Sequence, residues 1–279
     1  MIFLDKFKKA VSPLYNNPFG DFLRAKFQIR PPRFVRPLSG AETISDLFVW
    51  RVDEIWETRY TLMNLPSYIF PDQAETDHAT LITYNEDGNE IYRNNFELKP
   101  FECQKTDIRD LLQGKTGQGT FACFHSAGTL DKIQKAGCYL TDRQYVSYSW
   151  KGDNFCNFVH GNIYGLSKSP FQNKTRALVP WQGKMENYRP QLRFDDCDRF
   201  ELVYSNPSEK PLKVEVRLFD SNWREKEIHE ILIPIKGVKV LEFNNPSREL
   251  VFIENQSRIG LCRPVIFKHY ESFFDVLHS

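Results

Sequence analysis

The sequence has little of what marks a membrane-spanning or secreted protein. No apolar run approaches the roughly 18 residues that a membrane-spanning helix needs. The opening apolar stretch, Ile2-Phe3-Leu4, is too short for the apolar part of a secretory signal. The six cysteines contain no CxxC pair. These absences favour a cytoplasmic protein with reduced thiols.

Signatures of common enzymes are also missing. There is no GxSxG, no HExxH and no cysteine beside a histidine. Residues 114–119 read Gly-Lys-Thr-Gly-Gln-Gly and resemble a phosphate loop, but the glycine required five positions earlier is Arg109. A strand-like run follows at 120–124 where a phosphate loop would start a helix, so we expect a flexible hairpin loop. We expect no cofactor and favour a protein that is not an enzyme.

Charge is distributed unevenly along a chain whose net charge is only +1. Residues 1–40 hold eight basic and two acidic side chains, and they combine weakly helical with extended, proline-containing text. This basic, aromatic arm has three readings: packing on the body, binding a protein partner, or lying on an anionic membrane surface. The body carries the opposite sign of charge, so we expect no nucleic-acid partner.

The chain contains 23 Phe and 12 Tyr, and aromatic side chains favour strands. Short strand-like runs alternate with turn signals from about residue 45 onward, including a hairpin turn at 85–88. This pattern is typical of an all-β protein built from antiparallel sandwiches, in the general style of immunoglobulin-like or jelly-roll modules. That style assigns no function.

An internal repeat is the most informative feature of the sequence. Several segments of the first half recur in the second half in the same order, and each reads as a strand or a strand with its turn. The matches are 59–67 with 199–208 after one insertion, the spacing of 14 residues from Tyr84 to Leu98 with that from Phe219 to Ile233, and 155–161 with 273–279 at a constant offset of 118.

The repeat predicts two tandem β-sandwich domains related by duplication. We place the N-terminal arm at 1–44, the first sandwich at 45–168 and the second at 191–279. Residues 169–190 contain Pro170, Pro180 and Pro190 and are predicted to form a linker.

Histidines are the best-matched polar residues of the repeat. His160 and His278 each extend the apolar face of a strand, which is typical of a core-edge histidine and also of a ligand position at a sandwich rim. His125 ends another strand and would add to a site if it meets His160, and Gly161-Asn162 forms a turn that admits a ligand. A metal would need at least three such ligands, so we predict none.

Tryptophans at strand ends offer a second kind of site, because exposed aromatic rings stack on sugars. Trp150 ends a strand, and Trp181 lies in the predicted linker, where a cleft between domains is a preferred ligand position. Asp195, Asp196 and Asp198 form an acidic cluster that we read as a solvated turn.

Three functions remain open. The first is a non-catalytic binding or scaffold protein that recognises a carbohydrate or another small polar ligand at the rim or between the domains. The second is a histidine-dependent enzyme, with or without a metal. The third is a structural or membrane-peripheral assembly component that uses residues 1–40.

Overall fold

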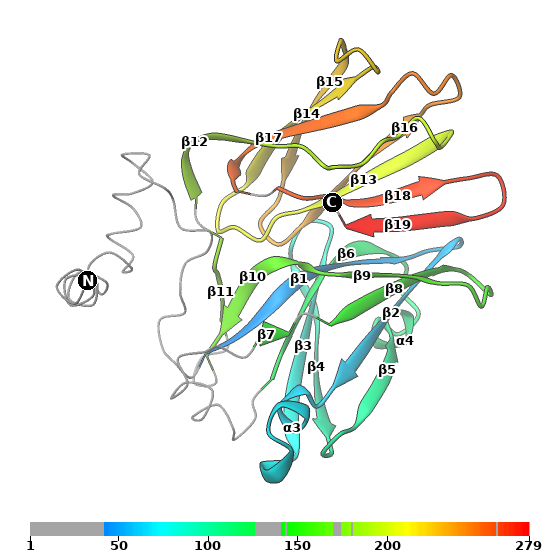
Figure 1. Cartoon of the computed structure of the whole chain (residues 1–279). Coiled ribbons are helices and arrows are strands. Elements are labelled where there is room, and N and C mark those ends of the chain that lie inside the picture. Colours follow the sequence, from blue (N-terminus) through cyan, green and yellow to red (C-terminus); the bar gives the residue numbers. More distant parts are fainter. Residues whose placement is uncertain are drawn as a thin grey trace, which may run out of the picture.

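The computed structural model describes residues 42–125, 141–142, 144–169, 174–179, 181–260 and 262–278. Within these residues the protein is all-β, and its only helical elements are α3 (Leu65–Ile69), η1 (Pro71–Gln73) and α4 (Ile108–Leu111). The strands pair antiparallel, apart from the short parallel pair of β1 with β7 (Figure 1). The predicted arm of residues 1–40 lies outside the described residues.

The first half of the chain, residues 42–177, forms two sheets. One has the strand order β11-β10-β1-β6-β3-β4, with β7 beside β1, and the other has the order β5-β2-β8-β9. The strands are β1 (Thr43–Val52), β2 (Trp56–Met63), β3 (Asp77–Asn85), β4 (Glu90–Leu98), β5 (Cys103–Asp107), β6 (Gly117–Phe124), β7 (Thr141–Asp142), β8 (Tyr145–Trp150), β9 (Asn157–His160), β10 (Asn162–Lys168) and β11 (Thr175–Ala177).

The second half, residues 181–278, forms two four-stranded sheets with the orders β12-β17-β14-β15 and β16-β13-β18-β19. The strands are β12 (Trp181–Tyr188), β13 (Arg199–Ser205), β14 (Leu212–Phe219), β15 (Glu225–Ile233), β16 (Val238–Asn244), β17 (Phe252–Ile259), β18 (Val265–His269) and β19 (Phe274–His278).

The two halves share one strand order. The run β1-β6-β3-β4 corresponds to β12-β17-β14-β15, and the run β5-β2-β8-β9 corresponds to β16-β13-β18-β19. The hairpins β3–β4 and β14–β15 also have a register shift at the same place, just before Tyr84 in one and Phe219 in the other. The repeated spacing of 14 residues therefore coincides with a repeated hairpin.

A buried asparagine ends the corresponding strands β2 and β13. The Asn64 side-chain amide donates to the Leu98 carbonyl at 3.1 Å, and the Asn206 amide donates to the Ile233 carbonyl at 3.0 Å. Both side chains are fully buried, and each accepts a hydrogen bond from the backbone N–H of a serine that follows. Each asparagine thus supplies the hydrogen bonds that its turn needs in the interior.

The strands follow from alternating polarity. In β2 and in β14 every second residue is buried, as expected where one face of a sheet packs on a core. The residues between them are largely charged or polar, so a register slip by one residue would expose the whole apolar set.

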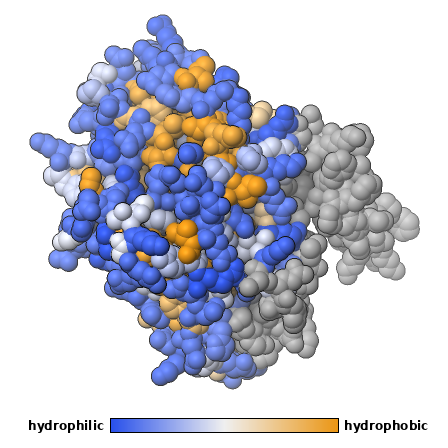
Figure 2. All heavy atoms as spheres, turned by 180° about the vertical axis from the view of Figure 1, so that it is seen from behind, coloured by the Kyte–Doolittle hydropathy of each residue, from blue (hydrophilic) through white to orange (hydrophobic). Residues whose placement is uncertain are grey.

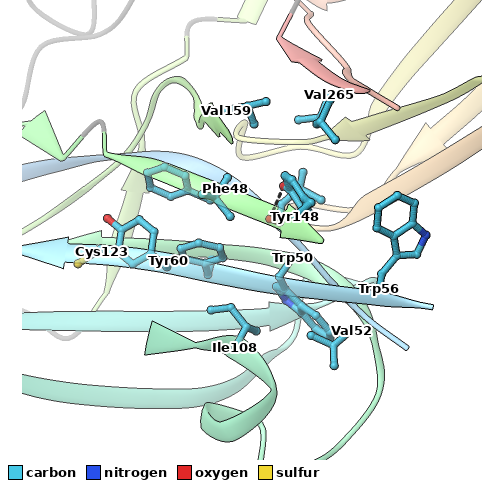
Figure 3. Packing of buried hydrophobic residues seen from close by; sticks show 14 of the residues in the cluster. Phe48, Trp50, Val52, Trp56, Tyr60, Ile108, Cys123, Tyr148, Val159 and Val265 are labelled. Atoms are coloured by element: carbon cyan, nitrogen blue, oxygen red, sulfur yellow. Dashed lines mark hydrogen bonds between the residues drawn. The ribbon is translucent and has the colours of Figure 1, made fainter. Parts of the chain in front are cut away.

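One core cluster runs through both halves. Trp56 and Tyr148 of the first half contact Phe267 of β18 with ring centroids 5.1 and 5.0 Å apart. Figure 3 shows Tyr148 in this cluster together with Val159 of β9 and Val265 of β18. The sheet β16-β13-β18-β19 is therefore buried on both faces.

This shared core differs from the expected pair of separate sandwiches. In β13, Val203 belongs to the core shared with the first half, and Leu202 belongs to the core of the second half. Residues 169–190, predicted as a linker, contain β11 and β12, which pair with β10 and β17.

The end strand β15 carries part of the apolar surface of the second half. Figure 2 shows apolar side chains gathered over the upper part of the molecule, where β14, β15 and β17 lie in Figure 1. Ile228 and Leu232 of β15 are 50% and 62% exposed. Between them, Glu230 pairs with Lys213 at 2.7 Å, and charges of this kind oppose strand addition at a sheet edge.

Candidate ligand-binding site

A pocket of about 490 Å³ opens where three turns of the first half meet. The turn after β1, the β3–β4 turn and the loop between α4 and β6 surround it. Its lining residues are Trp50, Arg51, Asp53, Asn85, Glu86, Asp87, Ile91, Tyr92, Leu112, Lys115, Thr116, Gly117 and Gln118. The volume lies in the range of pockets that hold small molecules.

The floor of the pocket is fixed by a close backbone approach. The Trp50 indole N–H donates to the Tyr84 carbonyl at 2.9 Å, passing directly over Gly119. A Cβ at Gly119 would lie 2.1 Å from the Tyr84 oxygen and 2.8 Å from Trp50 Nε1. Only glycine lets β1, β6 and β3 approach in this way, so Trp50 is held rigidly beneath the pocket.

Some polar groups at the rim of the pocket are hydrogen-bonded within the protein, and others are available to a ligand. Asn85 Oδ1 accepts from the backbone N–H groups of Asp87 and Asn89 at 3.1 and 2.9 Å, which fixes the β3–β4 turn. The side chains of Asp87, Lys115 and Thr116 have no hydrogen bond or ion pair with the residues described. They are exposed and available to a ligand.

Aromatic and charged side chains set the chemistry of the pocket. The Lys115 ammonium lies 5.4 Å from the centre of the Tyr92 ring. Two cations, Arg51 and Lys115, face three carboxylates in the lining, so the pocket carries a net charge of −1. This balance favours a neutral hydroxylated ligand over an anion such as phosphate, in agreement with the absence of a phosphate-loop signature.

Arg51 connects the pocket to the second half through a buried carboxylate. Glu201 of β13 accepts from Arg51 Nη1 at 2.5 Å, and its other oxygen lies 2.6 Å from Arg199 Nη2 and 2.7 Å from His269 Nε2. Burial raises the pKa of the Glu201 carboxyl, but the hydrogen bonds and charges of His269 and Arg51 outweigh it and lower the pKa to about 2. The carboxylate is therefore ionised and fixes one wall of the pocket.

The two repeated histidines meet each other, away from this pocket. The rings of His160 and His278 lie 4.3 Å apart, centre to centre, and are tilted by 30°. His160 stands opposite Tyr145 of β8, and His278 stands opposite Val265 of β18. His160 Nδ1 donates to the Gly161 carbonyl at 3.0 Å. The pair packs where the end strands β9 and β19 contact each other, and its functional role stays a prediction.

His125 has a different partner from the one that the sequence suggested. Its Nδ1 lies 2.5 Å from Asp77 Oδ2, and both side chains are completely buried. Among the described residues no group of three or more His, Cys, Asp or Glu side chains is placed to hold a metal ion. His125 therefore belongs to a buried hydrogen-bonded pair that joins the end of β6 to β3.

The tryptophans singled out from the sequence contact the cores. Trp150 packs on Phe274 with ring centroids 5.1 Å apart, and Trp181 packs on the second core with the Lys210 ammonium 5.5 Å from its ring. The backbone of Asn162 pairs with Leu47. None of the predicted site residues lines the pocket described above.

The acidic cluster is neutralised by cations. Asp195 bonds Arg193, Asp198 bonds Arg248, and Asp196 bonds the buried Lys268 at 2.8 Å. Residues 195–196 form a turn, and Asp196 and Asp198 are exposed, so the cluster is the expected solvated turn with its charges paired.

The pocket residues were missed in the sequence, although one signal was present. The glycines at 114, 117 and 119 suggested a flexible hairpin loop, and Gly119 among them allows the close approach that shapes the pocket. Gly114 and Gly117 have positive φ angles of 79° and 143°. Tyr92 and Asp87 line the pocket because the β3–β4 hairpin lies beside these glycines in the fold. Local sequence patterns do not predict that arrangement, since the two segments are distant in sequence.

Comparisons with known proteins assign no family. No known protein family matches the chain, and no curated protein matches it. Among solved structures, a glycosyl hydrolase family 2 member from Bacteroides cellulosilyticus DSM 14838 aligns at 8% identity, with a TM-score of 0.14. A second structure of a family 2 member from Bacteroides cellulosilyticus aligns at 9% identity, also with a TM-score of 0.14.

The alignments cover 85% and 86% of this chain but 28% of each hydrolase chain, so this chain spans under a third of their length. At such scores the likeness carries no argument about function. None of the described helices is long and apolar enough to cross a bilayer.

Proposed function

We propose that the protein is a non-catalytic binding module whose pocket takes a neutral carbohydrate or another small polar ligand. The observation that carries the proposal is the pocket of about 490 Å³, in which the half-buried Tyr92 ring lies beside hydroxyl, carboxylate and ammonium groups, with Trp50 buried beneath. A sugar ring presents an apolar face and a rim of hydroxyls, and aromatic rings with converging polar groups complement both.

The architecture suggests that the second half stabilises the pocket of the first half. We infer that the halves are two sandwich units descended from one duplicated module, because their strand orders and hairpin irregularities correspond. In this interpretation the second unit braces the pocket through Glu201 and Arg51. The corresponding turns of the second half differ in sequence, so the pocket is expected in one unit only.

The experiment is a binding screen with monosaccharides and disaccharides, followed by calorimetry on those that bind. Tyr92→Ala and Asp87→Asn are expected to weaken binding at least tenfold, equivalent to about 1.4 kcal/mol each. Tyr68→Ala is the matched control, since Tyr68 is also an exposed tyrosine on the first half but lies outside the pocket.

The result to be expected is a saccharide bound by the wild type and by Tyr68→Ala but not by Tyr92→Ala. Equal affinity in all three proteins would show that the pocket is not the binding site. The absence of binding across the panel would show that the ligand is not one of these carbohydrates.

A further inference from the structure

A second cluster of charged side chains surrounds Tyr84, on the face of the first sheet that is turned away from the main core. The Lys236 ammonium, from the β15–β16 turn of the second half, lies 4.9 Å from the centre of the Tyr84 ring. The Tyr84 hydroxyl lies 3.4 Å from Thr175 Oγ1. Lys168 is directly opposite Thr175 in the β10–β11 pair, so its side chain is on the same face as Thr175.

A third cation stands on the neighbouring strand. Arg93 of β4 is paired with Ile82, two residues from Tyr84 on the same side of β3. Its guanidinium bonds both oxygens of Glu90 at 2.8 and 2.7 Å. By contrast, neither Lys168 nor Lys236 forms an ion pair with any residue that the structure describes.

The backbone around Lys236 is clamped. Lys236 has a positive φ of 60°, its N–H donates to the Asn206 carbonyl at 2.8 Å, and its carbonyl accepts from the Thr120 hydroxyl. Gly88 lies so close to the same turn that a Cβ would be 1.7 Å from the Ile235 carbonyl oxygen. A strained residue that its surroundings hold so firmly is typical of a functional position.

Electrostatics make the two lysines unusual. Both are half-buried, and burial is the main cause that lowers the pKa of each ammonium. The charge of Arg93 lowers both further, while Glu90 and Glu209 act in the opposite direction on Lys236. Three cations here face two carboxylates, Glu90 and Glu209, of which Glu90 is bonded to Arg93 and Glu209 lies within reach of the Ala177 N–H. The three cations therefore outnumber the carboxylates by one, and a bound anion would relieve the remaining repulsion.

We propose that Lys168, Lys236 and Arg93 form a binding site for a tetrahedral oxyanion, as free phosphate or sulfate or as a small phosphate monoester. Tyr84 and Thr175 supply the floor of the site. Because their hydroxyls hydrogen-bond each other, one of the two protons remains to donate to the ligand. The site draws residues from both halves of the chain, so the anion crosslinks them. It shares no residue with the carbohydrate pocket and does not depend on it.

The test is thermal unfolding and calorimetry of the full chain with inorganic phosphate, inorganic sulfate or glucose 6-phosphate, each against chloride at matched ionic strength. We expect a saturable rise in Tm with the oxyanions. Lys168→Gln and Lys236→Gln should each raise the phosphate Kd about tenfold, the value for loss of one charge-assisted hydrogen bond. Lys213→Gln is the matched control, because Lys213 is an exposed lysine that is already paired with Glu230.

Two variants are used because Lys236 occupies a strained position, and Lys168 lies on a regular strand. Unchanged phosphate binding in Lys168→Gln would overturn the site even if Lys236→Gln did not fold. A wild-type Tm that responds equally to phosphate, sulfate and chloride would also overturn it. A lower Kd for glucose 6-phosphate than for phosphate would identify the monoester as the form recognised.

Discussion

Glu201→Gln tests the connection between the two halves. The substitution keeps the shape of the side chain but removes the charge that holds Arg51, whose side chain is only 15% exposed, together with His269. The amide also presents an N–H₂ group to donors. An ordinary pKa of 4.5 lowered to about 2 corresponds to about 3 kcal/mol of folding free energy at neutral pH. Removing one partner of a buried ion pair lowers the free energy of unfolding by a similar amount.

The sign of the pH dependence follows from the lowered pKa. Because the folded protein binds this proton less readily than the unfolded chain, the stabilisation is complete above about pH 4.5 and is lost as the pH falls towards 2. Urea unfolding of wild type and Glu201→Gln at neutral pH should differ by about 3 kcal/mol. The difference should shrink as the medium is acidified through that range.

Glu230→Gln is the control for this experiment, because Glu230 is in an exposed pair with Lys213 and should lose less than about 1 kcal/mol. If Glu201→Gln were no less stable than Glu230→Gln, or if its deficit stayed constant in acid, the assigned role of the Glu201 network would be wrong.

Three further sets of substitutions give distinct outcomes. Gly119→Ala should cost at least about 2 kcal/mol and alter Trp50 fluorescence, since its Cβ would displace the Tyr84 carbonyl; a neutral effect would contradict the close approach. Asn64→Ala and Asn206→Ala should lower stability by similar amounts, about 2 kcal/mol each, measured by urea unfolding; a loss confined to one would deny their equivalence. His160→Ala and His278→Ala should each lower the free energy of unfolding by about 1–3 kcal/mol and lower Tm by equal amounts; unequal losses would show that the paired rings are not a structural unit.

Local patterns predicted the strands well. The alternation in β2 and β14, the turn at 85–88 and the spacing from Tyr84 to Leu98 all reflect a side-chain period of two and the chemistry of tight turns. The pairing of strands from distant segments was predicted less well. The prolines of 169–190 suggested a linker, but this range contains β11 and β12, whose pairing with β10 and β17 depends on strands distant in sequence.

The candidate site could not be predicted, because it too depends on contacts between segments that are distant in sequence. His125 was considered beside His160, but strand order places it against Asp77. The contact of His160 with His278 required the two end strands to meet, which no local pattern encodes. The pocket likewise depends on Gly119 and on a hairpin more than twenty residues away, brought together by β6 and β3 pairing.

The most direct test of the binding account is a titration of the isotopically labelled full chain with the tightest-binding saccharide of the panel, followed residue by residue by NMR. The account predicts saturable shift changes confined to residues 85–92 and 112–118 and to Trp50, with none at His160, Trp150 or Trp181. Shift changes centred on the histidine pair, or spread evenly over the chain, would contradict it.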